Sequence, residues 1–197
     1  MYLVECDLIG NKPIVFGRFV DQDEIPEEKG MDKWDKMKKH FYLKANTDEN
    51  GDIIIPSFAI RNCLVTAATK AGDKFKGTTK WGSLFRTGFE CPEDCYVKVS
   101  GKNIKAKKAD GWSAFLPSSP GAAGAAGNKR VLKKFPIVRK GWSIHIKLII
   151  EDDRISSERV EEYLTLAGQR VGLGSFRKEN NGIWGTFAVK NFKSKGK

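Results

Sequence analysis

Glycines alternate with basic and aromatic side chains in residues 168–185, GQRVGLGSFRKENNGIWG, which we call the glycine-rich segment. Its basic and aromatic members are Arg170, Phe176, Arg177, Lys178 and Trp184. Glycines let a backbone approach a ligand closely and present N–H groups to phosphate oxygens. Arginine and lysine supply charged donors to the same oxygens, and aromatic rings can stack on nucleobases. The segment favours a site for phosphate groups and bases, while a tight helix-to-strand connection would need similar glycines.

Neither of two common nucleotide motifs is present in the chain. A phosphate-binding loop of the GxxxxGK[ST] type does not occur in the sequence. A dinucleotide fingerprint needs its glycines between a strand and a following helix. Here Gly172 and Gly174 lie between a predicted helix and a predicted strand, so the segment is no ordinary mononucleotide or dinucleotide site.

The cysteines do not favour a metal centre. Cys91 and Cys95 form a CxxxC motif, but no second pair follows and the chain has only two histidines. A structural zinc site needs four ligands, so we expect no metal and no cofactor, and interpret this motif as a loop with two thiols. Cys6 and Cys63 lie in apolar stretches and are predicted to be core residues.

The charge of the chain indicates a polyanionic partner. Lys and Arg number 35 against 24 Asp and Glu, which gives a formal net charge of +11 over 197 residues. A pI near 9.5 favours nucleic acid as the partner class, although the charge could also serve only solubility. Between residues 101 and 140, ten basic side chains face a single acid, Asp110.

Residues 101–134 are predicted to form a basic, mobile hairpin or loop. Their centre, from Pro117 to Gly127, is a Gly- and Ala-rich run that has no means of packing a core. Residues 10–50 form a second insertion, which is polar and contains an acidic cluster from Asp21 to Glu28. We expect both insertions to belong to one domain that spans residues 1–197.

The remaining segments predict a regular order of elements. Helix starts are marked by Ser57 and Ser156 as N-caps, and helix ends by Gly72 and Gly168. The apolar patterns predict strands over 2–9, 96–99, 142–150 and 183–189. The order is strand, helix, strand, strand, helix, strand, so we expect an α+β fold with a ferredoxin-like, RRM-like βαββαβ core and an antiparallel sheet. In RNA-recognition domains the uncovered sheet face carries stacking aromatic residues.

The location of the protein is predicted from what the sequence lacks. Its apolar runs are far shorter than the ~20 residues of a membrane span, and the N-terminus has no basic region typical of a signal peptide. We therefore expect a cytoplasmic protein that has no membrane partner.

The glycine spacing resembles that of a known superfamily. Gly172-x-Gly174 followed by Gly182-x-x-Gly185, after the second helix of a ferredoxin-like fold, is similar to the loop of the CRISPR-associated RAMP superfamily. The organisation resembles the Cas7 type, the backbone subunit that coats guide RNA, and short Cas7-like proteins of phages and prophages. The matching stretches are residues 55–64, 134–142 and 171–177, although the chain is small for a Cas7 subunit.

This resemblance implies a function. We expect a non-catalytic protein that binds single-stranded nucleic acid, RNA rather than DNA, either as a homo-oligomer assembled head to tail along the strand or in a Cas-type complex. Phosphates would be held by Arg61, Lys133, Lys134, Arg170, Arg177 and Lys178, and bases by Phe176 and Trp184. The glycines Gly172 and Gly174 would shape the loop. The resemblance also implies that the hairpin of residues 101–134 is a thumb-like loop that meets a neighbouring subunit.

Two alternatives remain open at this point. One is a RAMP-type endoribonuclease that works without metal, for which His40 or His145 would be the general acid or base. Loop aspartates cleave the target in some Cas7 subunits, which makes Asp21, Asp23 and Asp48 further candidates, although acidic clusters are usually solvated surface. The other alternative is a phage-encoded mimic of a Cas subunit that acts through protein contacts.

Overall fold

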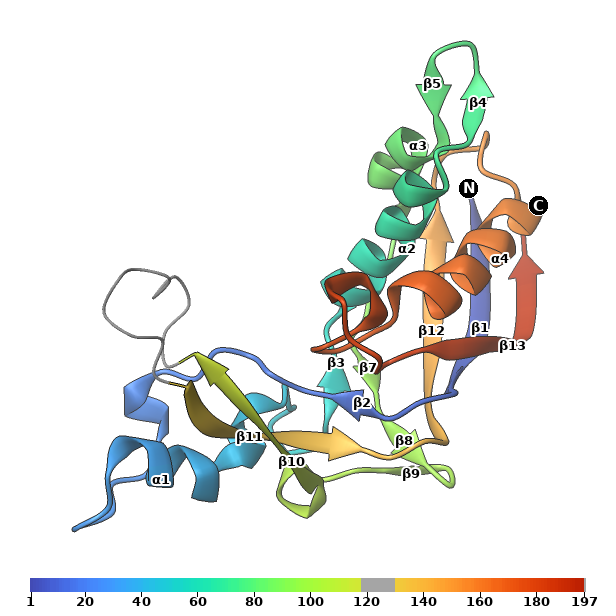
Figure 1. Cartoon of the computed structure of the whole chain (residues 1–197). Coiled ribbons are helices and arrows are strands. Elements are labelled where there is room, and N and C mark those ends of the chain that lie inside the picture. The colour runs from blue at the N-terminus through green and yellow to red at the C-terminus, as the bar shows by residue number, and fades with distance from the viewer. Residues whose placement is uncertain (118–129, 197) are drawn as a thin grey trace, which may run out of the picture.

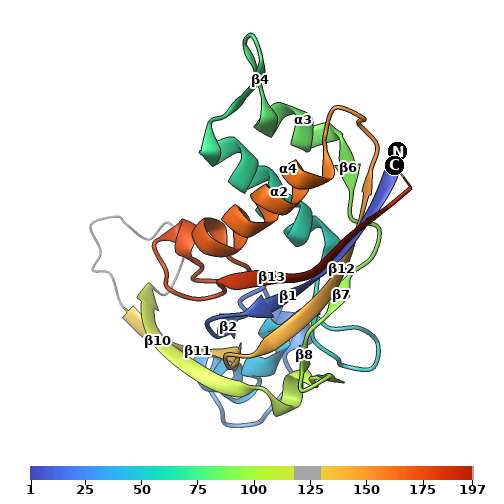
Figure 2. The same cartoon turned by 90° about the vertical axis from the view of Figure 1, so that its right-hand side faces the viewer.

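The main sheet of the computed structural model, which describes residues 1–117 and 130–196, is antiparallel and has the strand order β13-β1-β12-β8-β9. A further short strand, β6, pairs with the other end of β12. The strands are β1 (Tyr2–Gly10), β6 (Phe89–Glu90), β8 (Lys98–Val99), β9 (Lys102–Asn103), β12 (Trp142–Ile150) and β13 (Phe187–Lys195). Helices α2 (Ser57–Ala71) and α4 (Ser157–Leu166) cover one face (Figures 1 and 2). The predicted α+β, ferredoxin-like order is confirmed.

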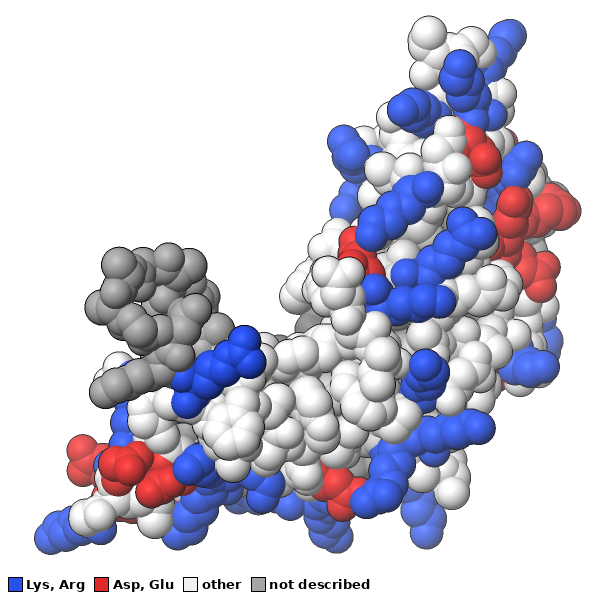
Figure 3. Space-filling view, in the orientation of Figure 1, with Lys and Arg blue, Asp and Glu red and all other residues white. Residues whose placement is uncertain are grey.

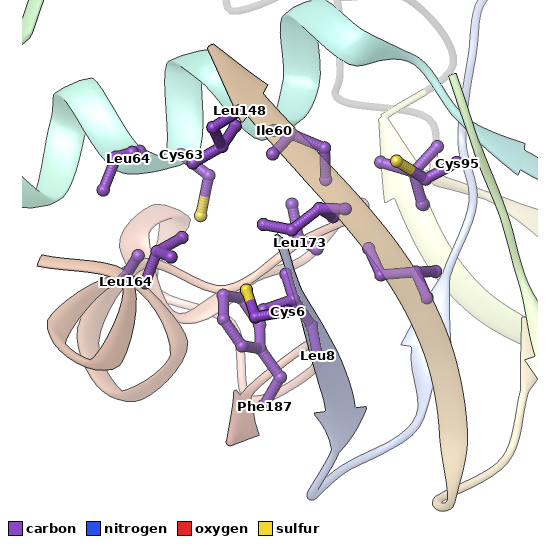
Figure 4. Close-up of a cluster of buried hydrophobic side chains, with 14 of the residues drawn as sticks. Cys6, Leu8, Ile60, Cys63, Leu64, Cys95, Leu148, Leu164, Leu173 and Phe187 are labelled. Carbon is purple, nitrogen blue, oxygen red and sulfur yellow. The ribbon is translucent and has the colours of Figure 1, made fainter. Parts of the chain in front are cut away.

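The core lies between this sheet and the two helices. Side chains alternate across β1, and Cys6 and Leu8 point at α2 and α4, where Cys63 and Leu164 meet them (Figure 4). Burial raises the pKa of both the Cys6 and the Cys63 thiols to about 12. The prediction that these two cysteines are core residues is confirmed.

The other face of the main sheet carries ion pairs where an RNA-recognition domain carries aromatic rings. On β1, Asp7 accepts hydrogen bonds from His145 Nδ1 at 2.8 Å and from Asn191 Nδ2 at 2.7 Å. Glu5 accepts one from Lys195 Nζ at 2.8 Å. The outward positions of β1 and β12 therefore hold no Phe, Tyr or Trp for base stacking, the usual mode of such domains, and their one imidazole, His145, is bonded to Asp7.

Several element ends differ from the prediction. Pro56, not Ser57, is the N-cap of α2, and the Ser57 N–H donates to Asp94 Oδ1 at 2.7 Å. The Ser156 side chain does cap α4, and Gly72 does end α2 in the left-handed conformation. Gly168 does not end the second helix, because the chain continues there through a π-helical turn, η4 (Ala167–Val171).

Two predicted strands also have different bounds. The predicted strand 96–99 is divided into β7 (Cys95–Tyr96), which pairs with β3 (Ile54–Ile55), and β8. The last strand begins at Phe187 rather than at residue 183 and runs on to Lys195. Residues 183–186 instead close the glycine-rich segment, because the Gly185 carbonyl accepts from the Leu173 N–H and the Gly185 N–H donates to the Pro13 carbonyl.

A second sheet, of order β10-β11-β2, stands beside the core (Figure 1). Its strands are β2 (Ile14–Val15), β10 (Asp110–Pro117) and β11 (Arg130–Val138). With it lie α1 (Lys33–Lys39) and the 3-10 turns η1 (Gln22–Glu24), η2 (Phe41–Lys44) and η3 (Ala106–Lys108). The centre of the predicted mobile loop, residues 118–127, lies outside the described residues. The flanking strands β10 and β11 pair along their whole length.

The remaining elements are short. Strands β4 (Lys74–Lys76) and β5 (Thr79–Lys80) form a projecting hairpin before α3 (Trp81–Thr87), and η5 (Lys178–Asn180) lies within the glycine-rich segment. Among the described residues, no helix is long and apolar enough to cross a membrane.

Candidate nucleic-acid interface

The glycine-rich segment is fixed by its own backbone. A Cβ on Gly185 would lie 1.8 Å from the Leu173 carbonyl oxygen, and one on Gly174 would lie 2.5 Å from that of Val15. Both glycines have positive φ, 72° and 78°. The N–H groups of Leu173 and Ser175 are already bonded to carbonyls of Gly185 and Val15. These glycines therefore let the chain approach itself, and the side chains of the segment are left to meet a ligand.

An aromatic cluster joins this segment to the second sheet. Phe176 meets Trp112 of β10 edge to face, with the ring centroids 5.0 Å apart, and Phe135 of β11 at 5.2 Å. Trp184 lies 6.0 Å from Trp112. Such edge-to-face pairs stabilise a contact beyond the area that they bury. Sequence reasoning singled out Phe176 and Trp184 but missed Trp112 and Phe135, because the pairing of β10 with β11 brings them there.

A groove of about 760 Å³ lies between this segment, β11 and the insertion that carries α1. Figure 3 shows a hollow between the part that contains α1 and the body that contains α2 and α4, with Lys and Arg on both flanks. The large apolar and aromatic side chains of the groove are Phe19, Ile25, Trp34, Met37, Leu116, Leu132, Phe135 and Phe176. Phe19 is 81 % exposed and Leu132 37 %, so the groove offers apolar surface to a ligand.

The charge of the groove is of one sign. Among its described lining residues none is Asp or Glu. Its basic members are Arg18, Lys33, Lys38, Lys44, Lys133, Lys134 and Arg177. Lys133 Nζ stands 5.5 Å from the centroid of the Trp34 ring, and Lys134 Nζ stands 4.4 Å from that of Phe41. Interleaved cations and aromatic rings suit a ligand that carries both phosphates and bases.

Some of these cations are already paired at the rim. Arg177 donates to Glu179 Oε2 through Nε and Nη2, and Lys70 Nζ lies 3.4 Å from the other oxygen of that carboxylate. Burial acts to raise the pKa of Glu179, but these two cations outweigh it and hold the pKa below its usual range. Arg18 is bonded to Glu24 and Lys38 to Asp35 in the same way.

Lys44 is the buried cation of the groove, and sequence reasoning missed it. The residue is 6 % exposed, and its ammonium donates to the Lys134 carbonyl at 2.6 Å and lies 4.2 Å from the Phe135 ring centroid. Burial, together with the charge of Lys133, lowers the pKa of Lys44 to about 8. Nothing in the run FYLK separates this lysine from the many solvated ones of the chain.

Of the ten residues predicted from the sequence to bind phosphate or bases, the structure places five in the groove lining and five outside it. Lys133, Lys134, Gly174, Phe176 and Arg177 line the groove. The predicted residues that do not line it are Arg61, Arg170, Gly172, Lys178 and Trp184. In α2, the Arg61 guanidinium donates to the Arg86 carbonyl, and Lys178 Nζ donates to the Gln169 carbonyl at 3.0 Å. Arg170 is exposed on η4, and Gly172 follows that turn.

None of the candidate catalytic residues is in the described lining of the groove, and three of them have side-chain partners. His40 Nε2 is 2.8 Å from Glu28 Oε1, and its Nδ1 is 3.1 Å from the Tyr42 hydroxyl. Asp48 Oδ1 accepts the N–H groups of Asn50 and Asp52, which is a turn-forming role. His145 is bonded to Asp7 on the sheet face, and Asp21 and Asp23 are exposed beside η1.

The two thiols of the CxxxC motif are both close to one carbonyl. Cys91 Sγ and Cys95 Sγ each lie 3.7 Å from the Glu93 oxygen. In the part of the chain that the structure describes, no three His, Cys, Asp or Glu side chains gather in a way that would hold a metal.

No protein-family model matches the sequence, and the comparison with curated proteins gives no significant match. Among solved structures, the chain is similar to a chain in the type III-B Cmr-beta complex bound to cognate target RNA. The TM-score is 0.52, with 11% identity over 98% of this chain and 60% of that chain. Cmr6 from Pyrococcus furiosus matches with a TM-score of 0.48 and 11% identity, over 95% of this chain and 97% of that one. The chain thus spans 60% of the first neighbour's length, and the likeness shows that the two chains share a fold.

Proposed function

We propose that this protein binds single-stranded RNA in the groove, without cleaving it, as a RAMP-type subunit of a CRISPR-like ribonucleoprotein. The observation that carries the proposal is the groove itself, whose described lining holds seven Lys or Arg side chains and no acid beside exposed aromatic rings. Cations can follow the phosphate chain while the rings accept bases of any sequence. The fold similarity to a chain from a complex bound to target RNA supports RNA as the ligand.

A single strand fits this groove better than a duplex. Phe19, Leu132 and Trp34 present apolar surface inside the basic lining, and only unpaired bases have free faces to lay against them. The paired bases of a duplex would leave this surface in contact with water. Affinity for duplex RNA is therefore expected to be lower at the same salt concentration.

Our proposal includes no chemistry on the strand. Both ring nitrogens of His40 are engaged, and the described groove lining contains no histidine. Of the two histidines considered for a nuclease that works without metal, this leaves His145, which Asp7 holds through Nδ1 on the sheet face. End-labelled RNA incubated with the protein in the presence of EDTA should stay intact. Cleavage that is lost in H145A would contradict the proposal and establish that alternative.

The binding test is the salt dependence of affinity for a fluorescent oligouridylate. Each phosphate neutralised should contribute about −0.7 to the slope of log affinity against log salt. Lys133→Ala should weaken binding and make the slope shallower by about 0.7, because one groove cation is lost. Lys29→Ala removes an exposed lysine outside the groove lining and should change neither quantity.

Two results would contradict the binding proposal. A salt-independent affinity would exclude phosphate contacts as its basis. Absence of any binding would favour the alternative in which the protein mimics a Cas subunit and acts through protein contacts.

Assembly of several copies along one strand is part of the same proposal. The interface expected from the sequence pairs the acidic cluster of residues 21–28 with a basic segment of the next copy. Two acids of that cluster already have partners in their own chain, since Glu24 pairs with Arg18 and Glu28 with Lys39 and His40. A neighbour would therefore meet chiefly Asp21, Asp23 and Glu27, which are exposed.

A further inference from the structure

Lys44 differs from every other described lysine in being both buried and part of the groove lining. An ammonium group has three N–H donors. One is used by the Lys134 carbonyl, and the Phe135 ring faces the charge at 4.2 Å. Among the described residues no carboxylate lies within ion-pair distance of Lys44. The positive charge is therefore held out of water without an opposite charge.

Such an arrangement is unfavourable unless something compensates it. Burying an unpaired charge costs free energy, and an apolar side chain of similar length would avoid that cost. The neighbouring elements increase the free-energy cost of this charge, because the side chains of Lys133, Lys134 and Arg18 in the same groove lining are also basic. The acids nearby, Glu24 and Glu179, are bonded to Arg18 and Arg177. Lys107 of η3, a further cation near η2, has its Nζ 5.6 Å from the centroid of the Tyr42 ring.

We propose that Lys44 and Lys133 form an anion site in the groove that takes a phosphate group, supplied by the backbone of the bound strand. Two ammonium groups would recognise the oxygens of the phosphate, which carries one negative charge in the backbone of a strand, and the Phe135 ring beside Lys44 excludes water. A free phosphate offers the same oxygens, and the experiment separates the two sources. The assignment of the strand as the source rests on the proposed function.

Binding at this site has a consequence for protons. Between pH 7 and 9, part of the Lys44 population is neutral in the unliganded protein, because its pKa is about 8. A phosphate oxygen beside the ammonium favours the charged form and raises that pKa. The strand should therefore be bound with uptake of a proton at Lys44, and its affinity should fall more steeply above pH 8 than phosphate contacts with exposed lysines require.

The experiment compares the full chain with K44M, K44R and K29M. Affinity for a fluorescent oligouridylate is measured at pH 7 and pH 9. The Lys44 ammonium is followed by NMR in protein labelled with 15N-lysine, with the K44M spectrum as its assignment. We expect K44M to lose about tenfold in affinity, K44R to keep affinity at both pH values, and K29M to stay within twofold of the original protein. Inorganic phosphate should raise the Lys44 pKa.

Each outcome decides one of the two proposals. If K44M binds RNA like K29M, the Lys44 site is wrong while the RNA-binding function stands. If the original protein binds no RNA but phosphate raises the Lys44 pKa, the anion site stands and free phosphate is its ligand, while the proposed function fails. If the protein binds no RNA and inorganic phosphate leaves the Lys44 pKa unchanged, both the anion site and the proposed function are wrong. Circular dichroism of K44M and K44R shows whether each variant is folded.

Discussion

The buried, unpaired ammonium of Lys44 lowers the free energy of unfolding of the protein. Its pKa is about 8 in the folded chain and near 10.5 as an ordinary lysine. Between these values the unfolded chain binds more protons, so the free energy of unfolding should rise with pH through this window. The rise expected from Lys44 alone is about 3 kcal/mol at most.

Lys44→Met should remove this dependence and be the more stable protein at pH 7, since it leaves no buried charge. Urea unfolding of the original protein and of K44M at pH 7.5 and pH 10 measures the free energy of unfolding and its dependence on pH. The difference between the two proteins cancels the other titrating groups of the chain. Equal pH dependence in both would show that Lys44 titrates as a solvated lysine.

At the same scale, sequence reasoning succeeded where a residue's neighbours in the chain decide its role. Cys6 and Cys63 lie in apolar stretches and are buried as predicted. Arg177 and Phe176 were singled out because glycines and basic residues surround them in the sequence; both line the groove, and their part in binding stays a prediction. Lys44 and Trp112 could not be found, because what makes them special is contact with Phe135 and Phe176 from distant segments.

The conformation of the glycine-rich segment depends on close contacts between backbone atoms. A substitution at Gly185 tests how much these contacts contribute to stability. Gly185 and Gly101 have similar positive φ, 72° and 78°, but only at Gly185 would a Cβ meet backbone, whereas Gly101 has open space around it. G101A should cost about 1 kcal/mol of unfolding free energy from its conformation alone. G185A should cost a further 1–3 kcal/mol, roughly, from overpacking.

Thermal or urea unfolding of G101A and G185A measures the two losses of unfolding free energy. Because the segment forms one wall of the groove, G185A should also weaken RNA binding, and G101A, in the turn between β8 and β9, should not. Equal destabilisation by the two substitutions would mean that the segment relaxes freely around Gly185.

The errors in element bounds have one physical origin. The run from Ile183 to Val189 alternates in a strand-like way, and Gly168 has the position of a helix terminator. In the folded chain, tertiary contacts override both patterns. Gly168 lies against the Phe187 backbone within a π-helical turn, and Trp184 is held in a bridge to Arg177 instead of joining the sheet.

For the whole molecule, the order of elements was predictable and the second sheet was not. The six core elements follow from apolar periodicity and cap residues, which are local properties. The β10-β11-β2 sheet joins residues 14–15 to 137–138, and no local pattern reports a pairing over that distance. The groove is built on this sheet, so its existence could not be predicted even though several of its residues were.

Assembly along a strand is the prediction that belongs to this scale. Multi-angle light scattering of the protein with oligouridylates of increasing length should show a bound mass that rises in steps of one subunit. Substitution of Asp21, Asp23 and Glu27 by Asn and Gln should reduce the number of copies on a long strand but not the affinity of a single copy for a short one. One copy per strand at every length would rule out the assembly.

The pairing of β1 also sets the order in which the chain can fold as it is made. β1 is synthesised well before its two partners, which are β12, beginning at residue 142, and β13, where Lys195 lies opposite Leu3. An emerging chain therefore carries β1 as an unpaired, alternately apolar strand until β12 has been synthesised, and with one edge still open until β13 follows. Contacts of such large sequence separation slow folding and leave strand edges exposed meanwhile. A chain interrupted before residue 187 has no β13 and leaves one edge of β1 open, so the main sheet is completed only when the segment 187–195 has been synthesised.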